Sequence, residues 1–370
     1  MSIYMAMVAL TLIFGYLMPQ EGPKRKQYVI LMAVIHGCVC AFRYEHLTGD
    51  LMKYHAIYLT LADEDWLSDA VFQEGRNAGF YWLMKLCAIV FDKEFQPFLI
   101  LLAVFGEVVM AVVIYRYSPA PWMSYLVWNC MGFYLFGFSS VKQAAAMAAL
   151  MLAFIGIMER KMGFYLGMMV LAGMLHTPSL IFLPAYWLCR LRVRPVTVLW
   201  YLIAGWLMYW YRGVFVRFIM QFYYEEEALE MFSGQIGNRF LMIVLFCVLG
   251  FLFRGFRSRN FECLFHLTAV AAILQMLGGF NNVFTRLTDY YFQFSVLYIP
   301  AIFFDSPSER YKPTRLPAMF EFNKRSRKVL SMFIVAFVIW FYWTYNINIT
   351  IEYAVDDYLN YRTMWHTPAG

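Results

Sequence analysis

Apolar runs close to 20 residues long recur along almost the whole chain, and short basic turns separate many of them. About 20 helical residues span the roughly 30 Å of hydrocarbon in a bilayer, so each run can form a membrane-crossing helix. Composition agrees, because 62% of the 370 residues are hydrophobic and only 15% are charged, too few to cover a water-soluble protein of this size. We therefore expect a single polytopic membrane domain over residues 1–370.

These runs, divided at proline, glycine and charged residues, predict an all-α bundle with about twelve membrane-crossing helices. The expected helices cover residues 1–18, 28–42, 97–115, 121–138, 141–158, 162–176, 178–190, 196–212, 239–253, 261–280, 287–304 and 329–345. A further apolar run at residues 79–91 covers only about 20 Å, which is short of the bilayer hydrocarbon. We expect a re-entrant or interfacial helix at this run.

Basic residues mark one side of the expected bundle. Lysine and arginine gather in short turns at residues 24–26, 160–161, 190–194 and 254–259 and in the loop 305–328. The positive-inside rule places these segments in the cytoplasm. The larger outer segments are then residues 43–96, which hold the short helix, residues 213–238 and the tail 346–370. The net charge of +6 is thereby assigned to turns beside anionic lipid, and no nucleic-acid partner is expected.

The seven cysteines all fall in apolar stretches. They form no C-x-x-C pair and share no metal-ligand spacing with histidines, and the acidic residues show no convincing metal-binding spacing either. From the sequence we expect neither a disulfide framework nor a metal site.

The helices expected at 162–176 and 178–190 are both short, although Lys161 and Arg190 must lie on the same side of the membrane. Their junction, His176-Thr177-Pro178, is therefore expected below the outer surface. Irregular backbone at such a depth is tolerated inside protein or beside a water-filled cavity. The sequence thus predicts a histidine in a buried site that opens outward.

Ionisable side chains inside a membrane cost roughly 2.5 to 3.5 kcal/mol each on insertion scales, so they are candidates for function. Most of them fall at outer helix ends or in outer loops, namely Arg43, Asp50, Lys142, His176, Arg239, Arg286 and Asp289. Cations beside an imidazole and a carboxylate suit an anionic substrate and proton transfer. The chemistry that fits best is displacement at a sugar carbon bearing a lipid diphosphate, because Arg or Lys donors stabilise the leaving group.

The cations also have structural alternatives. Arg43 and Arg239 could extend from helix ends toward lipid head groups. Lys142, which precedes Gln143 and three alanines, could belong to a helix-packing face.

Three further candidates have structural alternatives of their own. Arg286 and Asp289 have the spacing of an ion pair within one helix. His176 could be a core histidine bonded to a neighbouring carbonyl group, and only the shortness of its two helices favours a functional reading.

Short motifs occur in a fixed order along the chain. An arginine at a helix end precedes a Gly-Asp loop with spaced tyrosines, and an acidic-Gly-Phe segment follows more loosely. A basic residue with glutamine then begins a small-residue helix, a histidine precedes leucine and proline, and a late Asn-Arg-Tyr region closes the set. The members are Arg43, Gly49-Asp50, Tyr54, Tyr58, Glu74, Gly79-Phe80, Lys142-Gln143-Ala144, Arg160-Lys161, His176-Thr177-Pro178-Ser179-Leu180, Pro184, Asn281, Arg286, Tyr290 and Tyr291.

In kind and order these motifs resemble the EpsG-like family of membrane proteins, which includes Wzy-type polymerases of O-antigens, capsules and exopolysaccharides. The resemblance covers most of the chain. It implies a metal-independent glycosyltransferase of the bacterial inner membrane, similar in fold to GT-C-type enzymes. Such an enzyme joins undecaprenyl-diphosphate-linked oligosaccharide repeat units at the periplasmic face. Donor and acceptor lipids, membrane lipids, a chain-length regulator and a flippase are the implied partners, and no cofactor is implied.

Carried onto this chain, the resemblance makes His176 or Asp50 the general base. The residues expected to hold diphosphate or glycan are Arg43, Tyr54, Lys142, Gln143, Arg239, Arg286 and Tyr290. Lys142 departs from the family, which usually has arginine there, so a bidentate phosphate grip is replaced by a point charge. Asp50 is followed by Leu51-Met52 rather than directly by an aromatic residue, which leaves the register of the loop open.

Other functions remain open at this stage. An O-antigen ligase differs only in its acceptor. A membrane O-acyltransferase of surface sugars also uses an embedded histidine but leaves the outer cations unexplained. A transporter or flippase would bind the lipid diphosphate without reaction, and the internal repeats that would favour it are not evident in the sequence.

Overall fold

The computed structural model describes residues 2–18, 21–68, 77–223, 236–254, 258–280, 282–305, 324–344 and 362–365. Within these ranges the chain forms fifteen α-helices and two short 3-10 helices and contains no β-strand, which confirms the all-α class. The helices divide into two compact units, residues 1–180 with 331–370 and residues 181–330.

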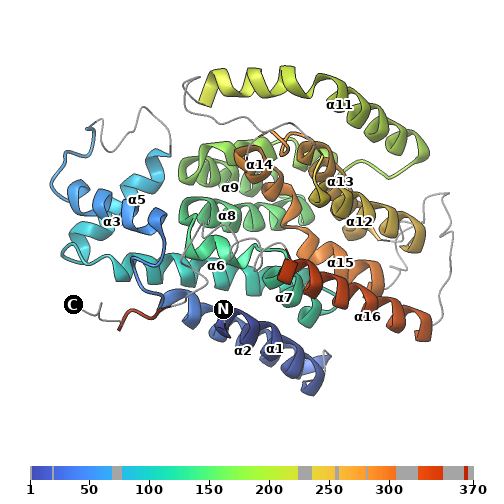
Figure 1. Cartoon of the computed structure of the whole chain (residues 1–370), viewed down its shortest axis with the longest axis horizontal. Helices are drawn as coiled ribbons and strands as arrows, with labels where there is room; N and C mark the ends of the chain where they lie inside the picture. Colours follow the sequence, from blue (N-terminus) through green and yellow to red (C-terminus); the bar gives the residue numbers. More distant parts are fainter. Residues whose placement is uncertain are drawn as a thin grey trace. The chain divides into compact units, whose positions relative to one another are not determined.

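The first unit is built around a helix of small residues, α8. Its helices are α1 (Ser2–Leu17), α2 (Gly22–Ala41), α3 (Gly49–Leu61), α5 (Ala78–Val90), α6 (Gln96–Tyr117), α7 (Pro121–Cys130), η2 (Tyr134–Phe138), α8 (Val141–Met158) and α9 (Met162–Leu175). Helix α8 packs between α6 and α9, and α2 packs along α6 (Figure 1). Alanines on α8 allow such close approach. At Gly156 a Cβ atom would lie 2.9 Å from the backbone nitrogen of Tyr165, so only glycine fits there.

Helices α3 and α5 form a pair that a buried lysine joins. Thr48 begins α3, because its hydroxyl accepts a hydrogen bond from the backbone N–H of Leu51 at 3.2 Å. Lys85 of α5 is 2% exposed, and its Nζ donates to the backbone carbonyls of Leu61 at 2.8 Å and of Glu64. A cation at these carbonyls satisfies groups left open at the end of α3 and complements its dipole. The short helix expected at 79–91 is confirmed, whereas α3 was not predicted.

The second unit contains α10 (Ala185–Leu188), α11 (Pro195–Tyr223), α12 (Asn238–Arg254), α13 (Arg259–Gln275), α14 (Asn282–Phe292) and α15 (Ser295–Phe304). Helices η3 (Thr177–Phe182) and α16 (Lys324–Phe341) each extend across the division between the units. Helix α13 packs against α12, α14 and α15. Ser258 begins α13, and its hydroxyl accepts from the N–H of Phe261 at 3.1 Å and donates to Asp305 Oδ2 at 2.6 Å.

Two cysteines of the second unit are paired, contrary to the expectation of no disulfide. Cys189 follows α10 and Cys263 is the fifth residue of α13, and the two form a disulfide with Cα atoms 4.3 Å apart. The pairing joins residues 74 positions apart, which the spacing of cysteines in apolar runs did not reveal. The remaining cysteines of the chain are free.

Three expected helices are divided in the structure. The run 178–190 becomes η3 and α10, which meet near Pro184, because proline removes a backbone donor and clashes with the preceding turn. The run 121–138 breaks after α7, where Gly132 takes a positive φ of 83°. The run 287–304 divides between α14 and α15.

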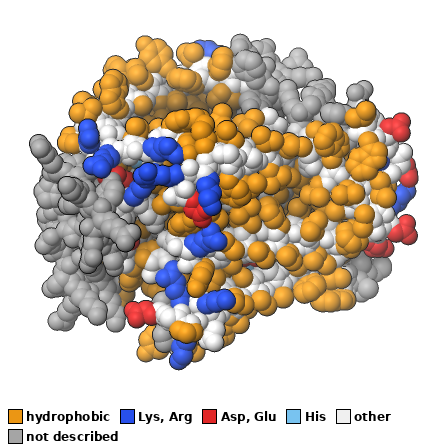
Figure 2. All heavy atoms as spheres, turned by 180° about the vertical axis from the view of Figure 1, so that it is seen from behind, with side chains coloured by type: hydrophobic (Ala, Val, Ile, Leu, Met, Phe, Trp, Pro, Cys, Tyr) orange, Lys and Arg blue, Asp and Glu red, His pale blue; other side chains and the backbone are white. Residues whose placement is uncertain are grey.

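The span count therefore stays a prediction. Two described helices, α6 (Gln96–Tyr117) and α8 (Val141–Met158), are long and apolar enough to cross a membrane. Shorter apolar helices include α9 (Met162–Leu175) and α15 (Ser295–Phe304). Figure 2 shows one face on which hydrophobic side chains cover a broad area while Lys and Arg side chains gather apart from it. Exposed apolar surface of this extent is typical of a surface that contacts lipid.

Candidate functional site

Lys142 lies in the first turn of α8, between tyrosines of two other helices. Its Nζ donates a hydrogen bond to the hydroxyl of Tyr81 of α5 at 3.0 Å. The same atom lies 5.1 Å from the ring centroid of Tyr81 and 5.2 Å from that of Tyr54 of α3. Both distances permit cation–π attraction. The ion pairs found among the described residues all involve other cations, so neutral groups hold this ammonium charge.

The start of α8 adds an electrostatic feature of its own. The residue before the helix, Ser140, makes no side-chain cap, and the N–H of Val141 donates to the backbone carbonyl of Ser139 at 3.0 Å. The positive end of the helix dipole and the Lys142 ammonium act together here and favour an anion. Gln143 is 2% exposed and therefore faces the packed interior.

The break predicted at His176 is present. His176 follows α9 with extended backbone, φ −154° and ψ 102°, and its N–H donates to the carbonyl of Ala172 at 2.8 Å. The carbonyl of His176 accepts from the N–H of Ser179 at 2.9 Å at the start of η3. The His176 side chain is half-buried. The expected irregular backbone is confirmed, whereas its depth in a membrane stays a prediction.

Two reciprocal hydrogen bonds fasten this break to α5. The N–H of Thr177 donates to Asn77 Oδ1 at 2.9 Å, and Thr177 Oγ1 accepts from the N–H of Asn77 at 3.3 Å. Asn77 precedes α5 with a φ of 56°, a conformation that asparagine tolerates better than most residues. Tyr81 follows Asn77 by four residues, which is about 6 Å along a helix. The first turn of α5 therefore contacts both the His176 break and Lys142.

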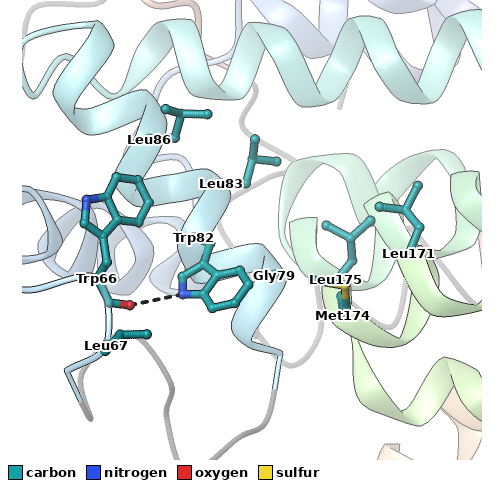
Figure 3. A pocket seen from close by; sticks show the side chains of 9 residues that line it. All are labelled: Trp66, Leu67, Gly79, Trp82, Leu83, Leu86, Leu171, Met174 and Leu175. Carbon is teal, nitrogen blue, oxygen red and sulfur yellow. Dashed lines mark hydrogen bonds between the residues drawn. The ribbon is translucent and has the colours of Figure 1, made fainter.

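An apolar cavity of about 500 Å³ lies beside the break (Figure 3). Trp82 and its neighbours on α5 form one wall, and residues of α9 that end next to His176 form another. The lining residues are Trp66, Leu67, Gly79, Trp82, Leu83, Leu86, Leu171, Met174 and Leu175. The Trp82 indole N–H donates to the carbonyl of Trp66 at 3.3 Å, so the polar edge of that ring is satisfied. The cavity suits a hydrocarbon group.

Asp50, the other expected base, lies in the first turn of α3 and is half-buried. Tyr54 follows it by four residues, and residues with this spacing lie on the same face of a helix. Asp50 is thus placed on the α3 face whose Tyr54 contacts Lys142. Helices α3, α5, α8 and the end of α9 bring together Asp50, Tyr54, Lys142 and, through α5, the His176 break.

Arg43 is buried and makes contacts that stabilise the fold. Its side chain is 1% exposed and donates to the carbonyl of Cys40, and its guanidinium carbon lies 5.9 Å from the ring centroid of Phe138. Its backbone forms a β-bridge with Thr363. Arg43 therefore faces the interior rather than lipid head groups, and it ties the loop before α3 to a segment near the C-terminus.

In the second unit, Arg239 of α12 forms an ion pair with Asp289 of α14. The Asp289 side chain is 2% exposed and that of Arg239 is 22% exposed, so the pair is largely buried. Arg286, which the sequence indicated as a possible partner of Asp289, is exposed and adds positive charge near this carboxylate, but the direct ion pair is made by Arg239. Tyr290 is fully buried. Arg239 thus has a carboxylate partner where a substrate phosphate was expected.

Residues important to this arrangement were missed from the sequence. Tyr81 contacts Lys142 across 61 positions, and Asn77 contacts Thr177 across 100 positions. The Gly79-Phe80 segment, which matches the family pattern, lies between Asn77 and Tyr81, but the pattern itself includes neither residue. Glu74 and Asn281 lie outside the described residues.

The helical fold, its exposed apolar surface and the polar residues at its helix ends define a helical membrane protein. A family model described as the EpsG family matches residues 26–363. The chain belongs to the EpsG family, and the resemblance read from its motifs is confirmed. The comparisons with curated proteins and with solved structures found no match. Family membership indicates a membrane protein related to polysaccharide synthesis.

Proposed function

We propose that this protein is a Wzy-like polymerase that joins undecaprenyl-diphosphate-linked oligosaccharide repeat units. The observation that supports this most strongly is the position of Lys142. Its charge is held by two tyrosines rather than by a carboxylate, and the helix of Tyr81, α5, also contacts the backbone break at His176 and lines an apolar cavity. A lipid diphosphate needs the same combination, which is a cation for its phosphates and an apolar surface for its hydrocarbon.

In the proposed reaction the Lys142 ammonium, at the positive end of the α8 dipole, binds the diphosphate of the donor. His176 accepts the proton of an acceptor hydroxyl, which then attacks the sugar carbon that bears the diphosphate. A new carbon–oxygen bond forms as the bond to the diphosphate breaks, and undecaprenyl diphosphate leaves with its charge stabilised by the cation. Asp50 is the second candidate for the base, because it shares the α3 face of Tyr54.

The other cations have separate proposed roles. Arg286 is exposed and is proposed to bind a diphosphate, whereas Arg43 supports the loop before α3. The Lys142 ammonium takes the place that a metal ion would have at the leaving group. We further propose that the site faces the periplasm of a bacterial inner membrane and that a flippase and a chain-length regulator act with the enzyme.

The test is polymerisation by purified protein in liposomes with one defined undecaprenyl-diphosphate repeat unit and no added metal or acyl donor. Wild-type protein should yield a ladder of glycan lengths. His176→Ala should lower turnover by about 10²- to 10⁴-fold if His176 is the base, while the melting temperature stays unchanged. Asp50→Asn run in parallel identifies the base, since only removal of the base should remove the pH dependence of turnover.

Near-normal turnover by His176→Ala would remove His176 from this role. Folded wild-type protein that forms no ladder with its cognate unit would contradict polymerisation. The alternative acceptor, an acyl donor, or a measurement of lipid movement across the bilayer would then distinguish a ligase, an O-acyltransferase and a flippase.

A further inference from the structure

Three side chains with metal-binding atoms converge next to α3. Glu45 and His46 lie in the segment that connects α2 to α3, and His55 lies within α3. His46 Nε2 and His55 Nδ1 are 2.6 Å apart, and Glu45 Oε1 is 4.0 Å and 3.9 Å from these nitrogens. The side chains of His46, His55 and Glu45 are 37%, 18% and 29% exposed, so an ion from solution can reach all three.

The surrounding residues fix the direction of both rings. The His55 ring stacks on Phe95 with centroids 4.9 Å apart and an interplanar angle of 7°. The His46 ring makes an edge contact with Tyr44 at 5.5 Å. The backbone N–H of Tyr44 donates to the carbonyl of Arg362 at 2.8 Å, which anchors the start of this segment. Ligands held by packing in this way lose little freedom when they bind an ion.

The donor set selects the kind of ion. Two imidazoles and one carboxylate suit zinc and similar first-row transition ions, whereas magnesium and calcium prefer oxygen ligands alone. Ligand atoms about 2.0 to 2.1 Å from a tetrahedral zinc ion lie about 3.3 Å from one another. The two nitrogens would therefore separate by about 0.7 Å and the carboxylate would approach by about the same amount. Small side-chain rotations of these partly exposed groups can supply such shifts.

We propose that Glu45, His46 and His55 bind a divalent transition-metal ion of the zinc class. Three protein ligands leave the fourth position of a tetrahedral ion open for water or for an anionic oxygen atom. The ion fastens the segment before α3 to α3 itself, the helix that carries Asp50 and Tyr54. This site is separate from the cation at Lys142, and the proposed glycosyl transfer needs no atom from it.

The experiment uses the full-length protein, stripped with EDTA and held in detergent, with no glycan substrate present. Zn²⁺ binding is measured by titration calorimetry, and Co²⁺ is added as a spectroscopic probe whose visible absorption reports nitrogen and oxygen ligands. Wild-type protein should bind one equivalent of either ion and gain melting temperature. His46→Ala and His55→Ala should each weaken binding by at least about 10-fold, since loss of even an outer-shell partner has that effect.

Two further variants control for damage to the fold. Glu45→Gln keeps both rings and should weaken binding without changing the melting temperature of the metal-free protein. Asp63→Asn changes an exposed carboxylate of the same unit and should bind as wild type does. Absence of saturable Zn²⁺ binding by wild-type protein, or unchanged binding by a folded His46→Ala/His55→Ala double variant, would overturn the proposal. Because the readout is ion binding, this outcome is independent of polymerisation.

Discussion

Each unit of the molecule holds a cation near a helix end, but the two cations have opposite surroundings. Lys142 of the first unit lies against the rings of Tyr54 and Tyr81 and donates to a neutral hydroxyl. Arg239 of the second unit is paired with the buried carboxylate of Asp289. The sequence presented both as candidate phosphate ligands, since each stands at an expected outer helix end.

The difference decides which cation can serve a substrate. A paired arginine has its charge balanced, and a diphosphate would have to compete with Asp289 for it. Aromatic faces stabilise an ammonium without balancing its charge, so the field around Lys142 remains positive and attracts an anion. The ammonium group also has N–H donors beyond the one that Tyr81 accepts. Of the two, Lys142 is therefore the better candidate for the diphosphate.

The largest effect is expected at the arginine. Arg239→Ala should lower the free energy of unfolding by about 3 to 5 kcal/mol, because it leaves the Asp289 carboxylate buried and unpaired. Replacing both members, as Arg239→Leu with Asp289→Leu, should recover most of that loss, since a pair of apolar residues avoids the desolvation cost. Thermal and denaturant unfolding in detergent, followed by circular dichroism, measures both variants. An Arg239→Ala protein that is as stable as wild type but inactive would show that Arg239 binds substrate. The proposed difference between Arg239 and Lys142 would then be wrong.

The next effect is expected at the lysine, and on turnover rather than on stability. Lys142→Ala should lower polymerisation by about 10²- to 10³-fold, the usual result of removing one donor that stabilises a developing anion. Its melting temperature should stay near that of wild type. Lys142→Arg should retain activity, because arginine occupies this position in the family resemblance and can grip a phosphate with two donors.

Lys161 provides a matched control, because it lies just beyond the opposite end of α8. It pairs with Glu159 at 2.7 Å on the exposed surface, where ion pairs contribute little to stability, so its removal should leave both the melting temperature and turnover nearly unchanged. The hydrogen bond from Lys161 also lowers the pKa of Glu159, so this small contribution is present near neutral pH and is lost as the pH falls. Equal loss of turnover in Lys142→Ala and Lys161→Ala would mean that the position of the charge on α8 is irrelevant.

Local pattern predicted much of the fold. The lengths of the apolar runs, and the proline, glycine and charged residues between them, predicted both ends of α8 and α9 to within one residue. They also predicted the short helix α5. Hydrophobic runs did not reveal α3, whose sequence contains charged and polar residues, nor the break between α14 and α15, whose residues read as one apolar run. Such elements depend on tertiary contacts, for example the capping of α3 by Lys85.

The candidate site was predicted only in part for the same reason. Residue type and position near a helix end singled out Lys142 and His176, and the break after α9 followed from helix length. Periodicity carries no information about partners 61 or 100 positions away. The contact of Tyr81 with Lys142 and the two hydrogen bonds between Asn77 and Thr177 were therefore not predicted. The pairing of Arg239 with Asp289, across 50 positions, was missed likewise.

The smallest expected effect concerns how firmly the Lys142 surroundings are held. At Gly79 of α5 a Cβ atom would lie 2.7 Å from Cβ of Met174 on α9, so Gly79→Ala must push the two helices apart. We expect a loss of about 1 to 3 kcal/mol in stability, as for other overpacked sites, together with a lower turnover because Tyr81 moves with α5. Gly167→Ala in α9 meets no atom within 4 Å and should be neutral or stabilise by about 0.5 to 1 kcal/mol.

Unfolding and turnover measured on the two alanine variants sharpen the comparison between the cations. A Gly79→Ala protein that loses turnover, and recovers it in combination with Met174→Ala, would show that the spacing of α5 and α9 positions the Lys142 site. If Gly79→Ala instead matched Gly167→Ala in both stability and turnover, α5 would be able to shift away from α9 without cost. The aromatic contacts of Lys142 would then hold it less firmly than the ion pair holds Arg239, and the contrast between the two cations would rest on charge alone.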